Sequence, residues 1–161
     1  MRRSIIFILF VLIGCQAKTN NNASSNNQVN NDINTEVINI ANNISCDKDV
    51  CLQLINHDSS KKTFDIYMTN SNSVAGFQCD FSGIKIVGSE GGLLKENGYQ
   101  TSHSDNRILS FSMHAKLIQP GKGVLSTIVY SESVDQICMT GIIFAGSGGE
   151  QLTNSMPECI K

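Results

Sequence analysis

Six cysteines are the residues in this 161-residue chain whose possible chemistry is best defined by their surroundings. A thiol can be acylated, oxidised to a disulfide or bound to zinc, and both the compartment and the spacing decide among these. No C-x-x-C motif occurs, and no histidine lies at ligand spacing from a cysteine, so a zinc site is not expected. Acylation and disulfide formation are the two chemistries that the spacing favours.

Cys15 lies at the end of a segment that is typical of exported proteins. Arg2 and Arg3 precede nine apolar residues, 5–13, before the chain turns polar. Nine residues span about 14 Å as a helix, less than half of a bilayer's hydrocarbon core, so a stable membrane span is not expected. Residues 1–14 are therefore predicted to be a signal peptide. The alternative is an ordinary secreted protein with a chance cysteine near its cleavage site.

The residues around Cys15 resemble the lipobox of bacterial lipoproteins, because Gly14 directly precedes the cysteine and Leu12 and Ile13 lie upstream. The resemblance implies that Cys15 is acylated and becomes the mature N-terminus, which anchors the protein to membrane lipid in the cell envelope. Gln16 stands where enterobacterial lipoproteins of the inner membrane carry Asp. The expected location is therefore the outer membrane, on its periplasmic side or at the cell surface.

The charge balance argues against nucleic-acid binding. The whole chain has 12 basic and 14 acidic residues, a formal net charge of -2. Removal of residues 1–14 takes away two arginines and leaves 10 basic and 14 acidic residues, a net charge of -4. A mildly acidic domain lacks the basic surface that a phosphate backbone requires.

The five cysteines after Cys15 should mostly be paired, because export places them in an oxidising compartment. Cys79 lies between Phe77 and Phe81 on the apolar face of a predicted strand, and we interpret it as a buried free thiol. Proximity and the expected strand ends assign the other four to the pairs Cys46 with Cys51 and Cys138 with Cys159.

No catalytic set is visible in the sequence. His57, His103 and His114 are far apart, and the signatures of serine hydrolases, zinc peptidases and phosphate-binding loops are absent. A calcium site made by Asp47 and Asp49, between Cys46 and Cys51, would offer too few oxygens for the usual six to eight ligands. We therefore expect no catalytic residues, no metal and no cofactor. The glycine-rich stretches 88–92 and 146–149 are interpreted as turns that lead into no helix able to bind an anion.

Two parts of the chain follow the signal peptide. Residues 15–44 form the lipidated N-terminus and an Asn-rich stretch, in which 11 of the 24 residues 20–43 are asparagine. This composition lacks the apolar surface needed to fold and predicts a flexible, disordered tether, the alternative being that it packs on the domain. The folded domain is expected at residues 45–161.

Alternating apolar and polar residues dominate the domain, which predicts half-buried strands. Phe64, Ile66 and Met68 form one apolar series, Phe77, Cys79 and Phe81 a second, and Leu109, Phe111 and Met113 a third. Further apolar runs lie at 51–55, 84–87, 124–130 and 137–145, and a single helical turn at 93–96 is ended by Gly98. Seven to nine short strands favour an all-β sandwich, with a closed barrel as the alternative.

The order of these segments resembles that of cohesin-like domains. Residues 74–83, with Gly76, Phe77 and Gln78, look like the cohesin strand motif V-x-G-[FY]-Q, and the resemblance extends over residues 51–159. It implies a jelly-roll sandwich of the superfamily that cohesins share with some carbohydrate-binding modules. From the residues themselves, Gly76 would permit a bulge or a close backbone approach, Phe77 would fill the core, and Gln78 would satisfy backbone groups.

The resemblance implies a non-catalytic binding module for a protein partner, because cohesins bind calcium-loaded dockerin modules through one sheet face. Carbohydrate binding and a purely structural envelope lipoprotein are the alternatives. Sugar-binding platforms use exposed aromatic rings, but tryptophan is absent and only Tyr67, Tyr99 and Tyr130 are candidates. The sequence therefore favours a dockerin-like or other protein partner over a carbohydrate.

Overall fold

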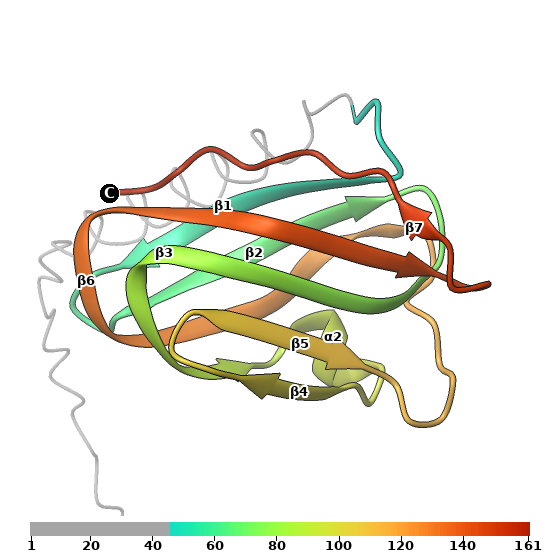
Figure 1. Ribbon diagram of the computed structural model, residues 1–161, viewed down its shortest axis with the longest axis horizontal. Coiled ribbons are helices and arrows are strands. Elements are labelled where there is room, and N and C mark those ends of the chain that lie inside the picture. The colour runs from blue at the N-terminus through green and yellow to red at the C-terminus, as the bar shows by residue number, and fades with distance from the viewer. Residues whose placement is uncertain (1–45) are drawn as a thin grey trace, which may run out of the picture. The chain divides into compact units, whose positions relative to one another are not determined.

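The computed structural model describes residues 46–161, so the predicted signal peptide, Cys15 and the Asn-rich tether lie outside the described residues. Seven strands and one short helix make up this part of the chain (Figure 1). They are β1 (Val50–Asp58), β2 (Thr63–Asn70), β3 (Val74–Glu90), α2 (Gly92–Glu96), β4 (Gln100–His103), β5 (Arg107–Phe111), β6 (Gly121–Gly146) and β7 (Gln151–Leu152). No helix within 46–161 is both long enough and apolar enough to span a bilayer.

The strands are hydrogen-bonded in the order β1-β2-β6-β3-β5-β4, with β7 added to β6, and every pair of strands is antiparallel. Because β3 and β6 are long and bend, this sheet folds over on itself into two layers (Figure 1). The β1 layer contains β1, β2, the first part of β6 and the last part of β3. The β5 layer contains β4, β5, β7, the first part of β3 and the last part of β6. The predicted all-β sandwich is confirmed.

Gly83 interrupts the regular pairing of β3 with β6. Its φ of 85° lies in the left-handed region, and a Cβ atom there would come within 1.9 Å of the backbone oxygen of Gln136. The pairing register between β3 and β6 shifts next to it, between Ser82 and Ile84. The sequence predicted separate strands on either side of this point and a turn at 88–92. The chain instead stays paired where β3 and β6 bend. Each of these two long strands therefore replaces two strands that the sequence predicted.

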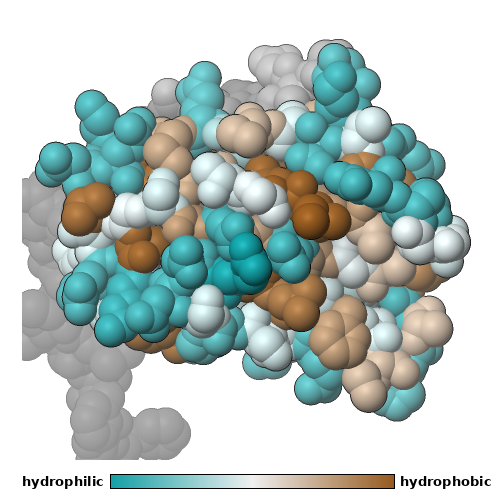
Figure 2. Space-filling model, viewed as in Figure 1, coloured by the Kyte–Doolittle hydropathy of each residue, from teal (hydrophilic) through white to brown (hydrophobic). Residues whose placement is uncertain are grey.

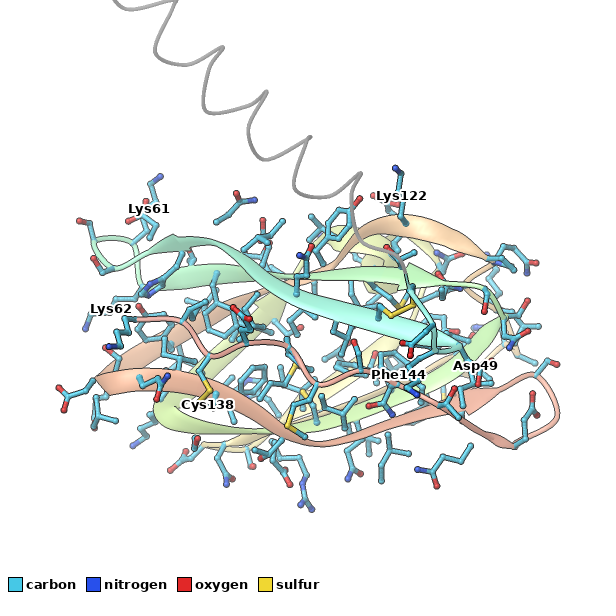
Figure 3. All side chains as sticks on the ribbon, turned by 90° about the horizontal axis from the view of Figure 1, so that it is seen from above. Asp49, Lys61, Lys62, Lys122, Cys138 and Phe144 are labelled. Carbon is cyan, nitrogen blue, oxygen red and sulfur yellow. A yellow bond between two sulfur atoms is a disulfide. The ribbon has the colours of Figure 1, made fainter. Side chains whose placement is uncertain are left out.

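Apolar side chains from both layers meet in one core. Phe64 of β2 contacts Phe81 of β3 edge to face, with ring centroids 5.6 Å apart, and Phe77 lies 4.8 Å from Phe144 of β6. Figure 3 views the layers edge-on and places Phe144 between them. All of these core residues lie between Val50 and Ile160, so residues 46–161 form a folding unit with its own core.

Two disulfides join the ends of the domain to the sandwich. Cys46 is bonded to Cys51 at the start of β1, and Cys138 of β6 is bonded to Cys159 near the C-terminus. These are the pairs that the sequence favoured. Cys79 is the free cysteine of the described part and is fully buried, as expected for a thiol that serves as a small hydrophobic residue.

The C-terminal segment, residues 153–161, runs across the gap between the two layers beside β1 (Figure 1). The backbone of Val50 bonds to Thr153 and Ser155 at one end, and Ile160 pairs with Ile137 of β6 at the other. Backbone bonds to both layers therefore close this side of the sandwich.

Candidate functional site

Strand β5 presents the opposite face from the one that the sequence predicted. Ile108 and Ser110 point into the core and are fully buried, whereas Leu109 and Phe111 point outward and are 42% and 41% exposed. Met113, expected to continue the inward series, lies beyond the end of β5 and is exposed. The Ser110 hydroxyl can be buried because it lies 2.8 Å from the hydroxyl of Thr101 on β4.

The outward side chains of four neighbouring strands form one surface, which we call the β5 face. Two rows of paired residues cross it in the strand order β6, β3, β5, β4. The first row is Ala145, Gly76, Phe111 and Gln100, and the second is Ile143, Gln78, Leu109 and Ser102. Ile143 is 44% exposed, so three large apolar side chains share this face. Figure 2 looks onto it and shows hydrophobic surface among neutral and hydrophilic side chains.

The three residues of the sequence motif hold different positions in this layer. Phe77 fills the core, as predicted. Gly76 lies on the β5 face beside a shift in pairing register after Val74, which agrees with the predicted bulge, but its backbone is not left-handed. A Cβ atom on Gly76 would make ordinary contacts, at 3.6 Å from Ser110 O and 3.8 Å from Ala145 Cβ. Close packing therefore does not require a glycine here.

Gln78 does not have the role that the sequence suggested. Among the hydrogen bonds of residues 46–161, the Gln78 side chain makes none to backbone groups. It lies half-exposed on the β5 face between Ile143 and Leu109, its partners on the neighbouring strands. The residue is therefore part of the surface rather than a support for the backbone.

An ion pair borders the apolar part of the β5 face. Asp80 of β3 and Arg107 of β5 are directly paired, and two hydrogen bonds join them, Nε to Oδ1 at 2.5 Å and Nη2 to Oδ2 at 2.8 Å. The hydrogen bonds from Arg107 hold the pKa of Asp80 below its ordinary value, and the positive charge adds to this effect. The carboxylate lies so close to β6 that a Cβ on Gly141 would be 2.7 Å from Oδ2. This border is thus charged but internally neutralised.

The histidines are not brought together. Nδ1 of His57 lies 2.9 Å from the backbone oxygen of Lys161, and its Nε2 lies 2.7 Å from the hydroxyl of Tyr130, whereas His103 and His114 are exposed elsewhere. His57 thus joins the C-terminal segment to β6. Within residues 46–161, no group of three or more His, Cys, Asp or Glu side chains is placed to hold a metal ion.

Asp49 has a structural role in place of the calcium site considered from the sequence. Its Oδ2 accepts hydrogen bonds from the backbone and the hydroxyl of Thr153, and its Oδ1 accepts one from Asn72. In Figure 3, Asp49 lies at one end of the sandwich, with Lys61 and Lys62 at the other. The carboxylate thus connects the start of β1 to the C-terminal segment.

The three tyrosines do not form a sugar-binding platform. Tyr99 and Tyr130 are buried, with exposures of 7% and 3%, and only Tyr67 is partly exposed. The Tyr99 hydroxyl donates to the backbone oxygens of Val74 and Lys116 at 2.7 and 3.0 Å, and the Tyr130 hydroxyl contacts His57. These rings are supports of the fold, which weakens the carbohydrate alternative.

Three hollows on the surface of the described residues gather no catalytic set. One of about 670 Å³ is lined by Lys62, Lys85 and Glu132, where β3 and β6 pair. A second, of about 530 Å³, lies beside α2, and a third, of about 480 Å³, lies beside β7. Contrary to expectation, the glycines 91 and 92 do lead into α2, but five residues are too short to act as an anion-binding helix. The predicted cap is confirmed, since Gly98 has a φ of 70°.

Comparison with protein-family models finds no match to the sequence, and comparison with curated proteins finds none either. A non-cellulosomal cohesin from the hyperthermophilic archaeon Archaeoglobus fulgidus aligns with a TM-score of 0.46 and 12% identity, over 70% of this chain and 87% of that chain. A chain of a complex between CaDoc0917 and CaCohA2 aligns with a TM-score of 0.47 and 10% identity, over 68% of this chain and 95% of that chain. Likeness at this level assigns no activity or partner.

Proposed function

We propose that residues 46–161 form a non-catalytic protein-binding module whose partner packs on the β5 face. The observation that carries this proposal is the outward position of Leu109 and Phe111 on β5 and of Ile143 on β6, which flank β3 on one face of the sheet. Covering apolar surface gains about 25 cal/mol for each Å² removed from water, so a group of exposed apolar residues favours a binding partner. The side chains around them are neutral or already ion-paired, so the partner is selected by shape and apolar contact more than by net charge.

We further propose that the module is held outside the cytoplasm by a lipid on Cys15. The sequence supports this through its two arginines, its short apolar segment and the lipobox-like residues before Cys15. The two disulfides of the domain support an oxidising compartment. Mass spectrometry of the N-terminal peptide from native membranes should find acylated Cys15, and an unmodified Cys15 would contradict the anchor.

The test of the binding face is a capture experiment with matched variants of residues 46–161. The immobilised domain is exposed to envelope and secreted proteins of its own organism, with and without calcium, because the sequence resemblance makes a dockerin-like module the first partner to look for. Leu109→Glu with Phe111→Glu places two charges on the β5 face. Val87→Glu is the control, because Val87 is 49% exposed on β3 in the β1 layer.

A protein that is retained by the native domain and by the Val87 variant, but lost by the double variant, supports the proposal once its binding is reproduced with both purified proteins. Equal retention by the double variant would contradict the proposal that the partner binds the β5 face. Saturable binding to a polysaccharide on a glycan array, unaffected by the double variant, would favour the carbohydrate alternative.

A further inference from the structure

The β5 face of one copy is complementary to the same face of a second copy. The two copies would be related by a rotation about an axis that follows the line between β3 and β5. Three rows of directly paired residues cross that line, Gly76 with Phe111, Gln78 with Leu109, and Asp80 with Arg107. In the first row a missing side chain lies beside a ring, and in the third an acid lies beside a base. The first and third rows therefore each contain two complementary halves, and the second row places a polar side chain beside an apolar one.

A two-fold axis that runs along the strands, above the middle of these rows, would place β3 of one copy over β5 of the other. Phe111 of each copy would then cover Gly76 of the other. Asp80 of each copy would face Arg107 of the other. Sheets that pack face to face lie about 10 Å apart, the spacing at which side chains of the two faces interdigitate. An interface of this kind uses the same surface twice and closes as a dimer.

The size pattern extends beyond the two central strands. Ala145 lies next to Gly76 on one side of the axis, and Gln100 lies next to Phe111 on the other. The rotation places Ala145 of one copy over Gln100 of the other, so that a small residue again faces a large one. Small residues thus occupy two neighbouring strands, and we call the space above Gly76 and Ala145 the depression, into which the Phe111 ring of a second copy would fit.

We infer that a second copy of this chain is a partner of the β5 face. This inference rests on the proposed function, because it assigns a partner to the same surface. Four strands spaced about 4.8 Å apart, each contributing about five residues of 3.4 Å, cover a projected area of roughly 300 Å². Stable interfaces bury about 800 Å² of accessible surface on each partner, so the expected dimer is weak and forms only at high protein concentration.

The test is sedimentation equilibrium of residues 46–161 between about 10 µM and 1 mM. Asp80→Arg leaves only positive charge in its row, and Arg107→Asp leaves only negative charge, so each variant alone should dimerise at least tenfold more weakly. An equimolar mixture of the two should form a heterodimer, because opposite charges again face each other across the axis. The double variant D80R/R107D should recover the native Kd, and circular dichroism checks that all variants remain folded.

A second pair of variants tests shape without changing charge. Gly76→Val fills the depression and should weaken the dimer at least tenfold. Gly88→Val is its control, because Gly88 lies on the same strand, is not left-handed and leaves ordinary contacts for a Cβ atom, with Val129 Cβ at 3.7 Å. The native Kd is expected for this control.

A native domain that stays monomeric to 1 mM would overturn the inference, and so would a mixture of the charge variants that associates no better than either alone. A dimer lost in the Gly88 variant but kept in the Gly76 variant would place the contact on the other layer and would also overturn it. A monomer whose capture of another protein still depends on Leu109 and Phe111 would overturn self-association alone and leave the proposed function standing.

Discussion

Gly76 on β3 and Phe111 on β5 are directly paired, and both face away from the core, so an exposed ring stands beside a position without a side chain. Neither the backbone conformation nor the packing of Gly76 demands glycine. The pairing of Gly76 with Phe111 makes the surface of the β5 face uneven, because a projecting ring and the depression lie in the same row. We expect this uneven shape to determine which partner the β5 face binds.

Two glycines of β3 should therefore respond in opposite ways to alanine. Gly76→Ala should keep or raise stability by up to about 1 kcal/mol, because the unfolded chain loses freedom and the native backbone accepts a Cβ. Gly83→Ala should lower the free energy of unfolding by at least about 2 kcal/mol, because its φ is 85° and the added atom overlaps the oxygen of Gln136. Urea unfolding compares the two, and equal effects would contradict the structure.

Tyr99→Phe removes the hydroxyl that bonds to the backbone oxygens of Val74 and Lys116. Val74 O keeps its hydrogen bond from the backbone N–H of Ile118, so the variant loses hydrogen bonding without orphaning that oxygen. We expect a loss of about 0.5–1.5 kcal/mol in urea unfolding. Tyr67→Phe, on the partly exposed outer surface, is the matched control and should stay within about 0.5 kcal/mol of the native value.

Asp49 should contribute a pH-dependent part of the stability. The hydrogen bonds from Thr153, helped by Asn72, hold its pKa below the ordinary value. Since the folded pKa is lower than the unfolded one, this stabilisation is present above about pH 4 and is lost as the pH falls toward the folded value. Asp49→Asn should lower Tm at pH 7 and show a smaller fall of Tm from pH 5 to pH 2. Parallel Tm curves for the two proteins would contradict this role.

The two disulfides should differ in their contribution to stability. Cys138 and Cys159 are 21 residues apart, so their bond restricts the unfolded chain by about 3 kcal/mol, whereas Cys46 and Cys51 are only 5 apart and should contribute less. Unfolding of the two paired Cys→Ser variants measures the difference. Hydrogen exchange at Ile160 should increase in the Cys138/Cys159 variant and remain unchanged in the other.

Cys79 should be unreactive in the folded domain. Burial raises the pKa of this thiol well above its ordinary value, and the negative charge of Asp80 adds to the shift. Under native conditions at pH 8, a thiol reagent should modify none of the domain, and in urea it should modify one cysteine per chain. Rapid labelling of the native domain would show that the core opens more readily than the packing indicates.

The sequence predicted those features that depend on local chemistry. The two cysteine pairs follow from proximity along the chain and from strand ends, and the cap at Gly98 follows from the turn preference of Asn97-Gly98. The sandwich follows from the alternation of apolar residues, which is a property of each strand separately. The expected and observed structures therefore agree in the cysteine pairs, in the helix cap and in the fold class.

The β5 face could not be predicted in the same way. Leu109 and Phe111 are more apolar than Ser110, so alternation alone places them inside. The opposite register is stable because Thr101, nine residues away along the chain, brings a hydroxyl to Ser110, and Ile108 fills the core next to it. The continuity of β6 was also hidden, because the mostly polar residues 131–136 separate the apolar runs 124–130 and 137–145, although part of this stretch pairs with β3.

The passage of β3 and β6 through both layers has a consequence for how the domain folds. Neither layer can be completed without the same two strands, so the layers should form and unfold together in a single cooperative transition. The two strands are separated along the chain by α2, β4 and β5, so their pairing closes a long loop before most contacts form. Folding should therefore take milliseconds to seconds, with the meeting of β3 and β6 as its slow step.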